Sequence, residues 1–316
     1  MILAALGVLV YFGYSVGKEK VEKGKKARHI SPGDYRIVVS LSKPDSVEPL
    51  ISIGAGIAKS QESELIALHV IGVPQQAFLE TGDQFIKESQ PIFEKAISRG
   101  KELGVTVAKK IVVSHNISEA ILDVARSGKT NLILMGGTEK QFRGKIKQTV
   151  PQIVMGSANC NVGVLFPKNF KTVRKILVPL GPGEHEYRLR FAEKLMKFFN
   201  AQMTIFTVVK ERSSIPDVQK KLDETIKSLG IPVKCEVEVA DSIPDAVSRK
   251  SKDYDLILIG PSTEWILHDV LFGSVPDSII NKSDCSVLIL KEPEQHAESM
   301  VGMVFDKIKK RIKAIA

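Results

Sequence analysis

A stretch of about 35 residues occurs twice in this chain, and this repeat constrains the fold more than any other feature. The later copy, residues 255–290, begins with Asp-Leu-Ile-Leu-Ile-Gly and ends with Val-Leu-Ile-Leu. The earlier copy, residues 131–165, begins with Asn-Leu-Ile-Leu-Met-Gly and ends with Val-Gly-Val-Leu, and its connecting loop is shorter by one residue. Residues 35–42 and 174–181, further upstream, are also alike. The chain therefore consists of two tandem copies of one α/β unit, each the size of an ordinary domain.

Short apolar runs alternate with amphipathic segments along both copies. In the second copy we predict strands at 176–180, 203–209 and 233–239, and helices near 189–199, 217–229 and 243–249. The first copy has the same order, with a long helical region at 83–103 that Pro91 must bend or interrupt. Neighbouring parallel strands need crossovers, so this alternation predicts two doubly wound, five-stranded parallel sheets. Repeat 1 spans residues 34–168 and repeat 2 spans residues 172–292.

The net charge of +9 is concentrated near the two ends of the chain. Residues 18–28 carry six Lys or Arg against two Glu, and residues 296–316 carry five against two acids. Only +2 remains for the body between them. A nucleic-acid-binding protein would carry the excess on its folded body, so we expect no nucleic acid partner. Basic residues beside apolar ends are typical of a protein at an anionic lipid surface.

Residues 1–17 contain no charged side chain, and Lys18 opens a basic linker, residues 18–33. Seventeen helical residues span about 25 Å, the short end of what crosses a bilayer. Positive charges that follow an apolar run are unlike a signal peptide and place the remainder in the cytoplasm. We expect a hydrophobic N-terminal helix that attaches the protein to the cytoplasmic side of the cell membrane. The alternatives are a hydrophobic tail packed on another protein, or the end of a longer polytopic protein.

The C-terminal residues 293–316 show a helical pattern that belongs to neither repeat. One face carries Val301, Val304, Ile308, Ile312 and Ile315, and basic residues surround the rest. This is a basic amphipathic helix, which suits an anionic membrane surface, an apolar groove or the body of the protein itself.

Three cysteines and the absence of catalytic motifs narrow the chemistry. Cys160, Cys235 and Cys285 are odd in number and unclustered, which suits a reducing compartment and predicts neither a disulfide framework nor a zinc site. We find no Gly-x-Ser-x-Gly, no complete phosphate-binding loop with Gly-Lys-Ser/Thr and no metal-ligand spacing. We therefore expect no enzymatic activity and no metal. We assign His69 to the core, and His115, His185, His268 and Trp265 to the surface or to packing.

Repeat 2 resembles a universal stress protein domain. The family hallmark is a strand-end Gly, two residues, Gly, nine residues and then Gly-Ser. This chain has Gly260, then Thr263 where the second Gly belongs, then Gly273-Ser274 after nine residues. The resemblance covers nearly all of residues 34–292 as a tandem pair and implies the fold of that family, similar to the adenine nucleotide alpha hydrolases.

Gly273-Ser274 has two interpretations. Its N–H groups and hydroxyl at a helix start suit a phosphate, but Ser274 with Asp277 is also a simple capping box. Repeat 1 keeps a capping pattern, Thr149-Val-Pro-Gln152, but has Glu139 and Gln148 where the family has Gly. Both copies therefore keep the helix-capping pattern, whereas residues that could bind a phosphate remain, if anywhere, only in repeat 2.

The resemblance implies a set of ligand-binding residues in repeat 2. Nucleotide-binding members of the family use an Asp for the ribose hydroxyls, and this chain has Gly181 there and Ser42 in repeat 1. The implied set has residues at the adenine, near the ribose and at the phosphates of ATP or AMP: Pro179 and Val208; Gly181; and Gly260, Thr263, Gly273, Ser274 and Val275.

Three functions remain open from the sequence. The first is a membrane-attached regulatory module that senses an adenine nucleotide in repeat 2. The second is the regulatory tail of a transporter, since such tandem modules resemble the cytosolic tails of some prokaryotic amino-acid permeases. The third is a structural pseudo-dimer without a ligand.

The last strand of each repeat, 162–165 and 287–290, reads as an exposed apolar edge that invites pairing. Single-domain universal stress proteins dimerise through this strand, so the resemblance implies that the two copies pair with each other. We expect an antiparallel pair that forms an intramolecular pseudo-dimer, with Cys160 and Cys285 near its opposite ends. Further association into a homodimer remains open.

Overall fold

A computed structural model of the protein describes residues 35–138, 149–181, 186–230, 233–261 and 274–293. The predicted hydrophobic segment 1–17, the basic linker 18–33 and the C-terminal helix beyond Pro293 lie outside these residues. Among the helices that are described, none combines the length and the apolar character that crossing a bilayer requires.

Repeat 1 contains five strands connected by helices. In chain order its elements are β1 (Ile37–Ser40), α2 (Val47–Ser60), β2 (Leu65–Gly72), α3 (Gln90–Glu102), β3 (Val107–Ser114), α4 (Ile117–Ser127), β4 (Leu132–Gly136), α5 (Val150–Ser157) and β5 (Asn161–Phe166). Short 3₁₀ turns lie at Pro44–Ser46, Leu79–Phe85 and Lys87–Ser89. The long helical region predicted at 83–103 is interrupted near Pro91, as expected, but its first part forms short 3₁₀ turns and not an α-helix. The α-helix begins only at Gln90, with Pro91 in its first turn, where the missing N–H costs no hydrogen bond.

Repeat 2 follows the same course. Its elements are β6 (Lys175–Pro179), α6 (Glu186–Phe199), β7 (Gln202–Val209), α7 (Ile215–Leu229), β8 (Lys234–Val239), α8 (Ile243–Ser251), β9 (Leu256–Ile259), α9 (Ser274–Lys282) and β10 (Ser286–Lys291). A 3₁₀ turn, Arg212–Ser214, leads into α7.

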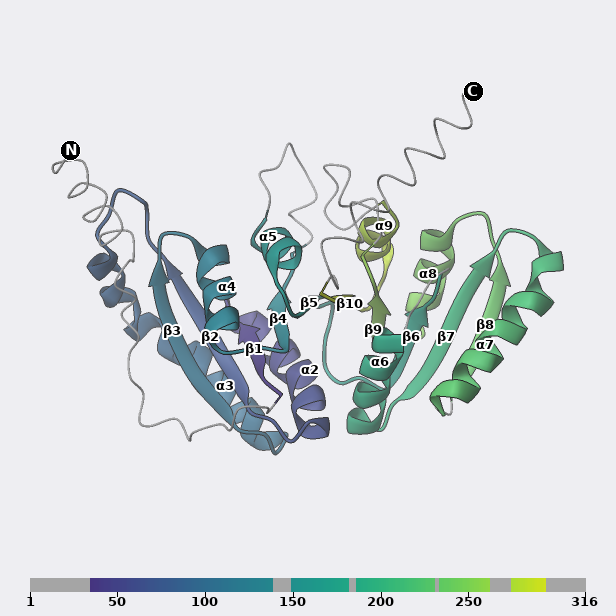
Figure 1. Ribbon diagram of the computed structural model, residues 1–316, viewed down its shortest axis with the longest axis horizontal. Coiled ribbons are helices and arrows are strands. Elements are labelled where there is room, and N and C mark those ends of the chain that lie inside the picture. The colour runs from purple at the N-terminus through teal and green to yellow at the C-terminus, as the bar shows by residue number, and fades with distance from the viewer. Residues whose placement is uncertain (1–34, 139–148, 182–185, 231–232, 262–273, 294–316) are drawn as a thin grey trace, which may run out of the picture.

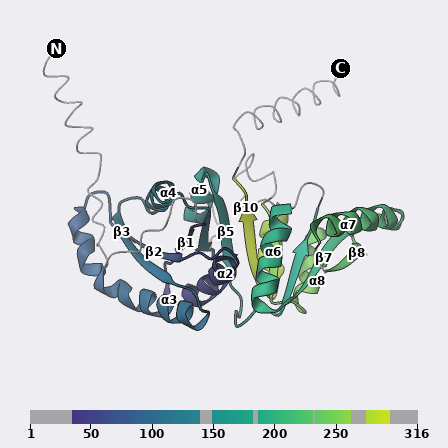
Figure 2. The same cartoon turned by 60° about the horizontal axis from the view of Figure 1, so that its bottom comes forward.

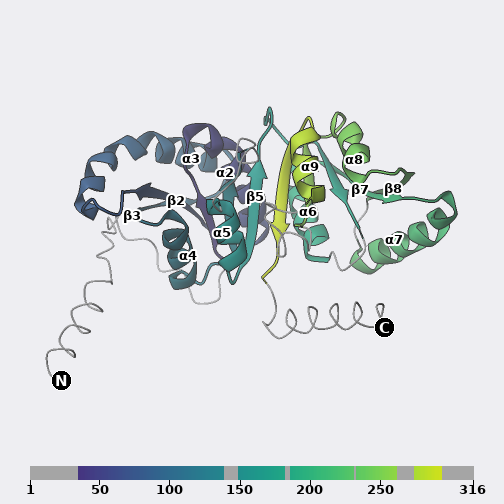
Figure 3. The same cartoon turned by 90° about the horizontal axis from the view of Figure 1, so that it is seen from above.

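The strands form one ten-stranded sheet in the order β3-β2-β1-β4-β5-β10-β9-β6-β7-β8 (Figure 1). Within each repeat the neighbouring strands are parallel, as the alternating pattern predicts. The repeats join where β5 and β10 pair antiparallel, with Val164 opposite Ile289. Figure 2 shows these two strands at the centre of the molecule, and in Figure 3 their arrows run in opposite directions. The predicted edge pairing is confirmed, and Cys160 and Cys285 precede opposite ends of the pair.

Two apolar cores cover the two faces of the sheet, and each extends through both repeats. One core packs strand residues such as Val39 and Leu258 against α2, α3, α6 and α7. The other packs residues such as Val38 and Ile257 against α4, α5, α8 and α9. In Figure 1 these two helix layers lie below and above the sheet. Successive side chains along each strand therefore point alternately into the two cores, which explains why the strands are apolar at nearly every position.

The repeats also contact each other through helices α2 and α6. A Cβ at Gly56 of α2 would lie 2.8 Å from Leu195 Cδ2 and 3.2 Å from Phe198 Cδ1. Glycine is therefore the residue that permits this close approach of the two helices.

Two lysines bind helix ends across the junction. Lys168, just after β5, donates from Nζ to the carbonyls of Ile280 (2.9 Å) and Ser283 (2.7 Å), at the end of α9. Lys291, at the end of β10, donates to the carbonyl of Met155 (2.9 Å) in the last turn of α5. A cation at a helix C-terminus satisfies carbonyls that have no partner within the helix. Each repeat thus supplies a charge that stabilises a helix of the other.

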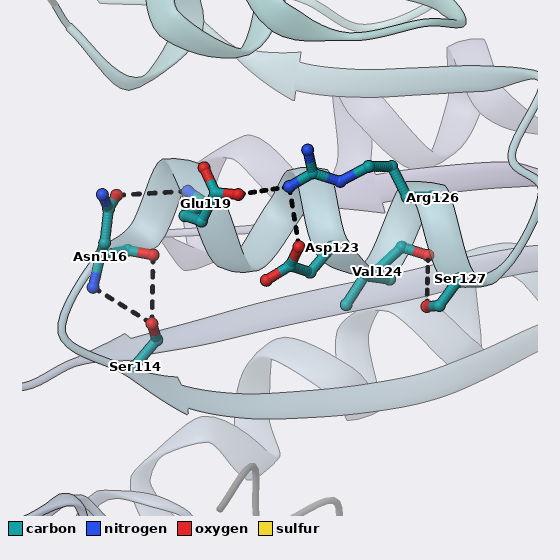
Figure 4. Close-up of polar contacts among 7 residues, drawn as sticks. All are labelled: Ser114, Asn116, Glu119, Asp123, Val124, Arg126 and Ser127. Carbon is teal, nitrogen blue, oxygen red and sulfur yellow. Dashed lines mark hydrogen bonds and ion pairs between the residues drawn. The ribbon is translucent and has the colours of Figure 1, made fainter. Parts of the chain in front are cut away.

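Helix α4 shows how local sequence starts a helix (Figure 4). The Asn116 side chain accepts a hydrogen bond from the Glu119 N–H at 3.2 Å, which is the usual role of an N-cap residue. Further along the same face, Arg126 pairs with Glu119 and, at 2.8 Å, with Asp123. These pairs are exposed to solvent and contribute little to stability. The buried face of the helix, with Ile121 at its centre, contributes most of its stability.

Candidate functional site

A cavity of about 980 Å³ lies in repeat 2, where three neighbouring parallel strands end. Its floor comes from the carboxyl ends of β6, β7 and β9: Pro179, Leu180 and Gly181; Phe206, Thr207, Val208 and Val209; and Ile259, Gly260 and Pro261. Its walls come from four helices: Arg188 of α6; Val218, Lys221, Leu222, Glu224 and Thr225 of α7; Ile243 and Val247 of α8; and Val275, Pro276 and Ile279 of α9. Ligands of open α/β sheets bind at this end of the strands.

Most of the described residues that the sequence assigned to a ligand meet in this cavity. Pro179, Gly181, Val208, Gly260 and Val275 all line it, although they come from four different elements. Ser274 is the neighbour of Val275 at the start of α9, but it is not part of the lining. The remaining two residues of the predicted set, Thr263 and Gly273, lie outside the described residues.

Gly260 has a second role that the sequence did not reveal. The guanidinium of Arg188 occupies the space beside it, and a Cβ at residue 260 would lie 2.9 Å from Arg188 Cζ and closer still to Nη2. Any larger residue would displace the arginine. In this structure the atoms that closely approach the backbone of Gly260 are therefore those of the arginine.

Arg188 is a site residue that our sequence interpretation missed, although a signal was present. It lies in the first turn of α6, four and seven positions before Ala192 and Leu195, both fully buried. A charged residue at this spacing belongs to the apolar face of the helix. Such a position is unusual for an arginine unless a partner or ligand compensates it.

The electrostatics of the cavity are dominated by this arginine. Burial lowers the pKa of the Arg188 guanidinium, and the charge of Glu292 partly offsets this effect. Within the part of the chain that the structure describes, Arg188 Nε is buried and has no hydrogen-bond partner. Lys221 is the second cation of the lining, and Glu224 supplies a carboxylate. The cavity therefore presents an excess of positive charge among apolar walls.

Gly181 leaves room at the end of β6. Among the described residues, a Cβ added there would meet no atom within 4 Å. The position at which the resemblance implies an Asp therefore carries no carboxylate of its own.

Repeat 1 differs from repeat 2 at the same strand ends. The ring of Phe166 lies against Gly137, so that a Cβ there would be within 2.8 Å of the Phe166 Cδ1. Pro49 occupies, in α2, the third helical position that Arg188 occupies in α6. The predicted capping in this repeat is confirmed, since the Thr149 N–H donates to Gln152 Oε1 at 2.8 Å. Glu139 and Gln148 lie outside the described residues.

The histidines and cysteines that the structure describes have structural roles. His69 Nδ1 bonds the Leu41 carbonyl at 2.7 Å, so this histidine has a hydrogen-bond partner as expected, although it is only partly buried at the edge of the core. His115 Nδ1 lies 3.2 Å from the Val73 carbonyl. Burial raises the pKa of all three thiols, to about 11 for Cys160 and Cys235 and about 12 for Cys285. His185, Trp265 and His268 lie outside the described residues.

Comparison with known proteins identifies the family. The profile of the universal stress protein family matches residues 35–165 and 219–291, and the chain belongs to this family. No curated protein sequence matches the chain. A crystal structure of a universal stress protein from Archaeoglobus fulgidus is similar, with 15% identity and a TM-score of 0.59. This similarity covers 82% of this chain and 97% of the other.

The cytoplasmic domain of a prokaryotic cation chloride cotransporter has a similar fold. It is 11% identical, with a TM-score of 0.57 over 83% of this chain and 97% of the other. A fold similar to that of this chain therefore occurs both in a universal stress protein and in the cytoplasmic domain of a transporter.

Proposed function

We propose that this protein is a regulatory, non-enzymatic module that binds an adenine nucleotide, ATP or AMP, in repeat 2 alone. The observation that carries the proposal is the cavity of about 980 Å³, which is lined by Pro179, Gly181, Val208, Gly260 and Val275. In the proposed complex Pro179 and Val208 contact the adenine, and Gly181 lies near the ribose. Gly260 and Val275 lie near the phosphates. Binding would bias the contacts of the module with a partner.

The size and the walls of the cavity support a ligand of this class. Small-molecule sites are typically clefts of about 300–1,000 Å³ with apolar walls and few polar groups. Apolar side chains such as Phe206, Val218 and Ile279 suit a base, and the start of α9 suits a phosphate. In repeat 1 the Phe166 ring fills the space beside Gly137, one residue after the glycine that corresponds to Gly260, which favours binding in repeat 2.

A titration of the full chain with ATP and with AMP, followed by calorimetry, tests this proposal. We expect Ser274→Ala to weaken ATP roughly tenfold, about 1.4 kcal/mol, because one hydroxyl is lost. The matched control is Thr149→Ala, which removes the hydroxyl at the equivalent helix start of repeat 1 and should leave the affinity unchanged. Equal losses from both substitutions would contradict binding by repeat 2 alone. If neither nucleotide binds, the structural pseudo-dimer is the better description.

We also propose that the module is attached to the cytoplasmic side of the cell membrane, at an anionic lipid surface. The uncharged segment 1–17 followed by six basic residues within 18–28 supports this attachment. Deletion of residues 1–28 should move most of the protein from the membrane pellet to the soluble fraction. A truncated protein that pellets as completely as the whole chain would contradict the proposed attachment.

A second candidate is the regulatory domain of a transporter. The similarity to the cytoplasmic domain of a cation chloride cotransporter favours this possibility on the level of the fold. On this view the partner is a membrane domain, as in the amino-acid permeases with tandem tails, and the nucleotide is not required. The genomic sequence upstream of the Met1 codon separates the two candidates, since an open frame with spanning helices supports the transporter.

A further inference from the structure

Arg188 is held inside the cavity of repeat 2 by the fold itself. The buried face of α6, with Leu189, Ala192 and Leu195, anchors the helix on the sheet. This packing brings the guanidinium of Arg188 against the backbone of Gly260 at the carboxyl end of β9. The arginine lines the same cavity as the strand ends of β6 and β7. Its charge is therefore placed at the floor of the cavity rather than in solvent.

The surroundings of Arg188 leave hydrogen-bonding capacity for a ligand. Its Nε is buried without a partner among the described residues. A buried N–H without an acceptor is unfavourable, and an arginine keeps its charge. Glu292 is near enough for its charge to raise the pKa of Arg188, but burial outweighs this effect. Because Arg188 lines the cavity, a ligand oxygen bound there can pair with the guanidinium.

The rest of the lining also favours an anion. Lys221 adds a second positive charge, and Glu224 is the only carboxylate among the described lining residues. The first turn of α9, with Val275 and Pro276, faces the cavity and adds the positive end of a helix dipole. At the end of β6, Gly181 has no carboxylate for the hydroxyls of a sugar, and a Cβ there would meet none of the described residues within 4 Å.

We infer that Arg188 binds the anionic group of the ligand, and that the cavity recognises phosphate charge instead of ribose hydroxyls. A guanidinium binds phosphate oxygens through two parallel N–H groups, which a lysine cannot reproduce. Residue 181 is a glycine and therefore has no carboxylate that could bind the ribose hydroxyls. That the ligand is a nucleotide rests on the proposed function. That the site binds phosphate rests on the position of Arg188 in the cavity.

Calorimetric titration of the full chain at fixed ionic strength tests the inference. Four probes are compared: ATP, 2′-deoxy-ATP, adenosine and inorganic triphosphate. For the wild type we expect ATP and 2′-deoxy-ATP to bind within about twofold of each other. Arg188→Met, which keeps the volume of the side chain and removes its charge, should weaken ATP and triphosphate at least about tenfold, the loss of one charged hydrogen bond. It should leave adenosine unchanged.

Two further variants control for fold and for charge. Arg190→Met removes a cation from the same helix turn, but Arg190 pairs with Glu193 at 3.3 Å and does not line the cavity, so no probe should change. Arg188→Lys keeps the charge without the planar guanidinium and should weaken ATP and triphosphate while adenosine is unchanged. If Arg188→Met does not fold, as judged by circular dichroism, this variant decides the outcome.

The outcomes separate the inference from the proposed function. If ATP binds and both Arg188 variants bind it like the wild type, the inference is overturned and the proposed function stands. If 2′-deoxy-ATP binds more than about tenfold more weakly than ATP, the sugar part of the inference is overturned. If triphosphate binds through Arg188 but adenosine does not bind and ATP gains nothing over triphosphate, the nucleotide function fails and the anion site stands. If no probe binds, both are overturned.

Discussion

Replacing Val164 with proline tests whether the β5–β10 junction holds the two repeats together. Val164 is fully buried, with Met135 of β4 on one side and Ile289 of β10 on the other. A strand with neighbours on both sides uses each N–H in one ladder or the other, so proline removes a hydrogen bond in either case. The carbonyl left without a donor costs about 1–3 kcal/mol. Fitting the ring into a close-packed core costs about 1–3 kcal/mol more.

The expected loss, about 2–6 kcal/mol, is a large part of the 5–15 kcal/mol that is typical for a domain. Val164→Ala is the matched control, because it keeps the N–H and loses only two methyl groups, about 2 kcal/mol. Urea unfolding followed by circular dichroism should give one transition for the alanine variant at a lower midpoint. The proline variant should show separate transitions for the two repeats, or aggregation through the exposed strand edges. A proline variant that unfolds in one transition, within about 0.5 kcal/mol of the alanine variant, would refute the reasoning.

Four other predictions concern stability and reactivity. Lys168→Met removes two hydrogen bonds to the end of α9 and should lower the free energy of unfolding by about 1–3 kcal/mol. The control Lys171→Met, at an exposed position, should leave the free energy of unfolding unchanged. Equal urea midpoints for the two variants would contradict this prediction. Gly56→Val should force α2 away from Leu195 and lower the free energy of unfolding by about 1–3 kcal/mol. An unchanged melting temperature would disprove the close approach of the two helices. Lys234 and Lys250 hold the pKa of the Glu236 carboxyl below its usual range. That carboxylate therefore adds stability above the unfolded pKa of about 4.3 and loses it as the pH falls through the folded pKa. Glu236→Gln should therefore destabilise the protein more at pH 7 than at pH 3. Cys285 is buried and Cys160 and Cys235 are half-buried, and this burial raises the pKa of the three thiols. The native protein should therefore react with a disulfide reagent far more slowly at pH 7 than the protein unfolded in guanidinium, and equal rates would refute this reasoning.

The order of strands and helices was predictable because each element carries its own periodic pattern of apolar residues. The runs at 132–135 and 256–259 are apolar at every position, and both became strands covered by a helix layer on each face. The helical region at 83–103 was the exception. There the apolar pattern continues before Gln90, but the chain forms short 3₁₀ turns instead of an α-helix. Periodicity reports which residues are buried, and it does not by itself distinguish a helix from a series of turns.

The sequence by itself determined the two repeats, their parallel sheets and the strand ends at which a ligand would bind. These follow from local apolar patterns and from the fact that the pattern occurs twice in the chain. Only the tertiary structure decided what meets at those ends. Arg188 and Gly260 are 72 positions apart, and nothing in either pattern says that the guanidinium lies on the glycine backbone. The same holds for Lys168 and the end of α9, since the packing of two elements depends on side-chain shape across the contact. Local patterns encode how much of a residue is buried, whereas the identity of its neighbour is set by the three-dimensional fit of segments distant in the chain.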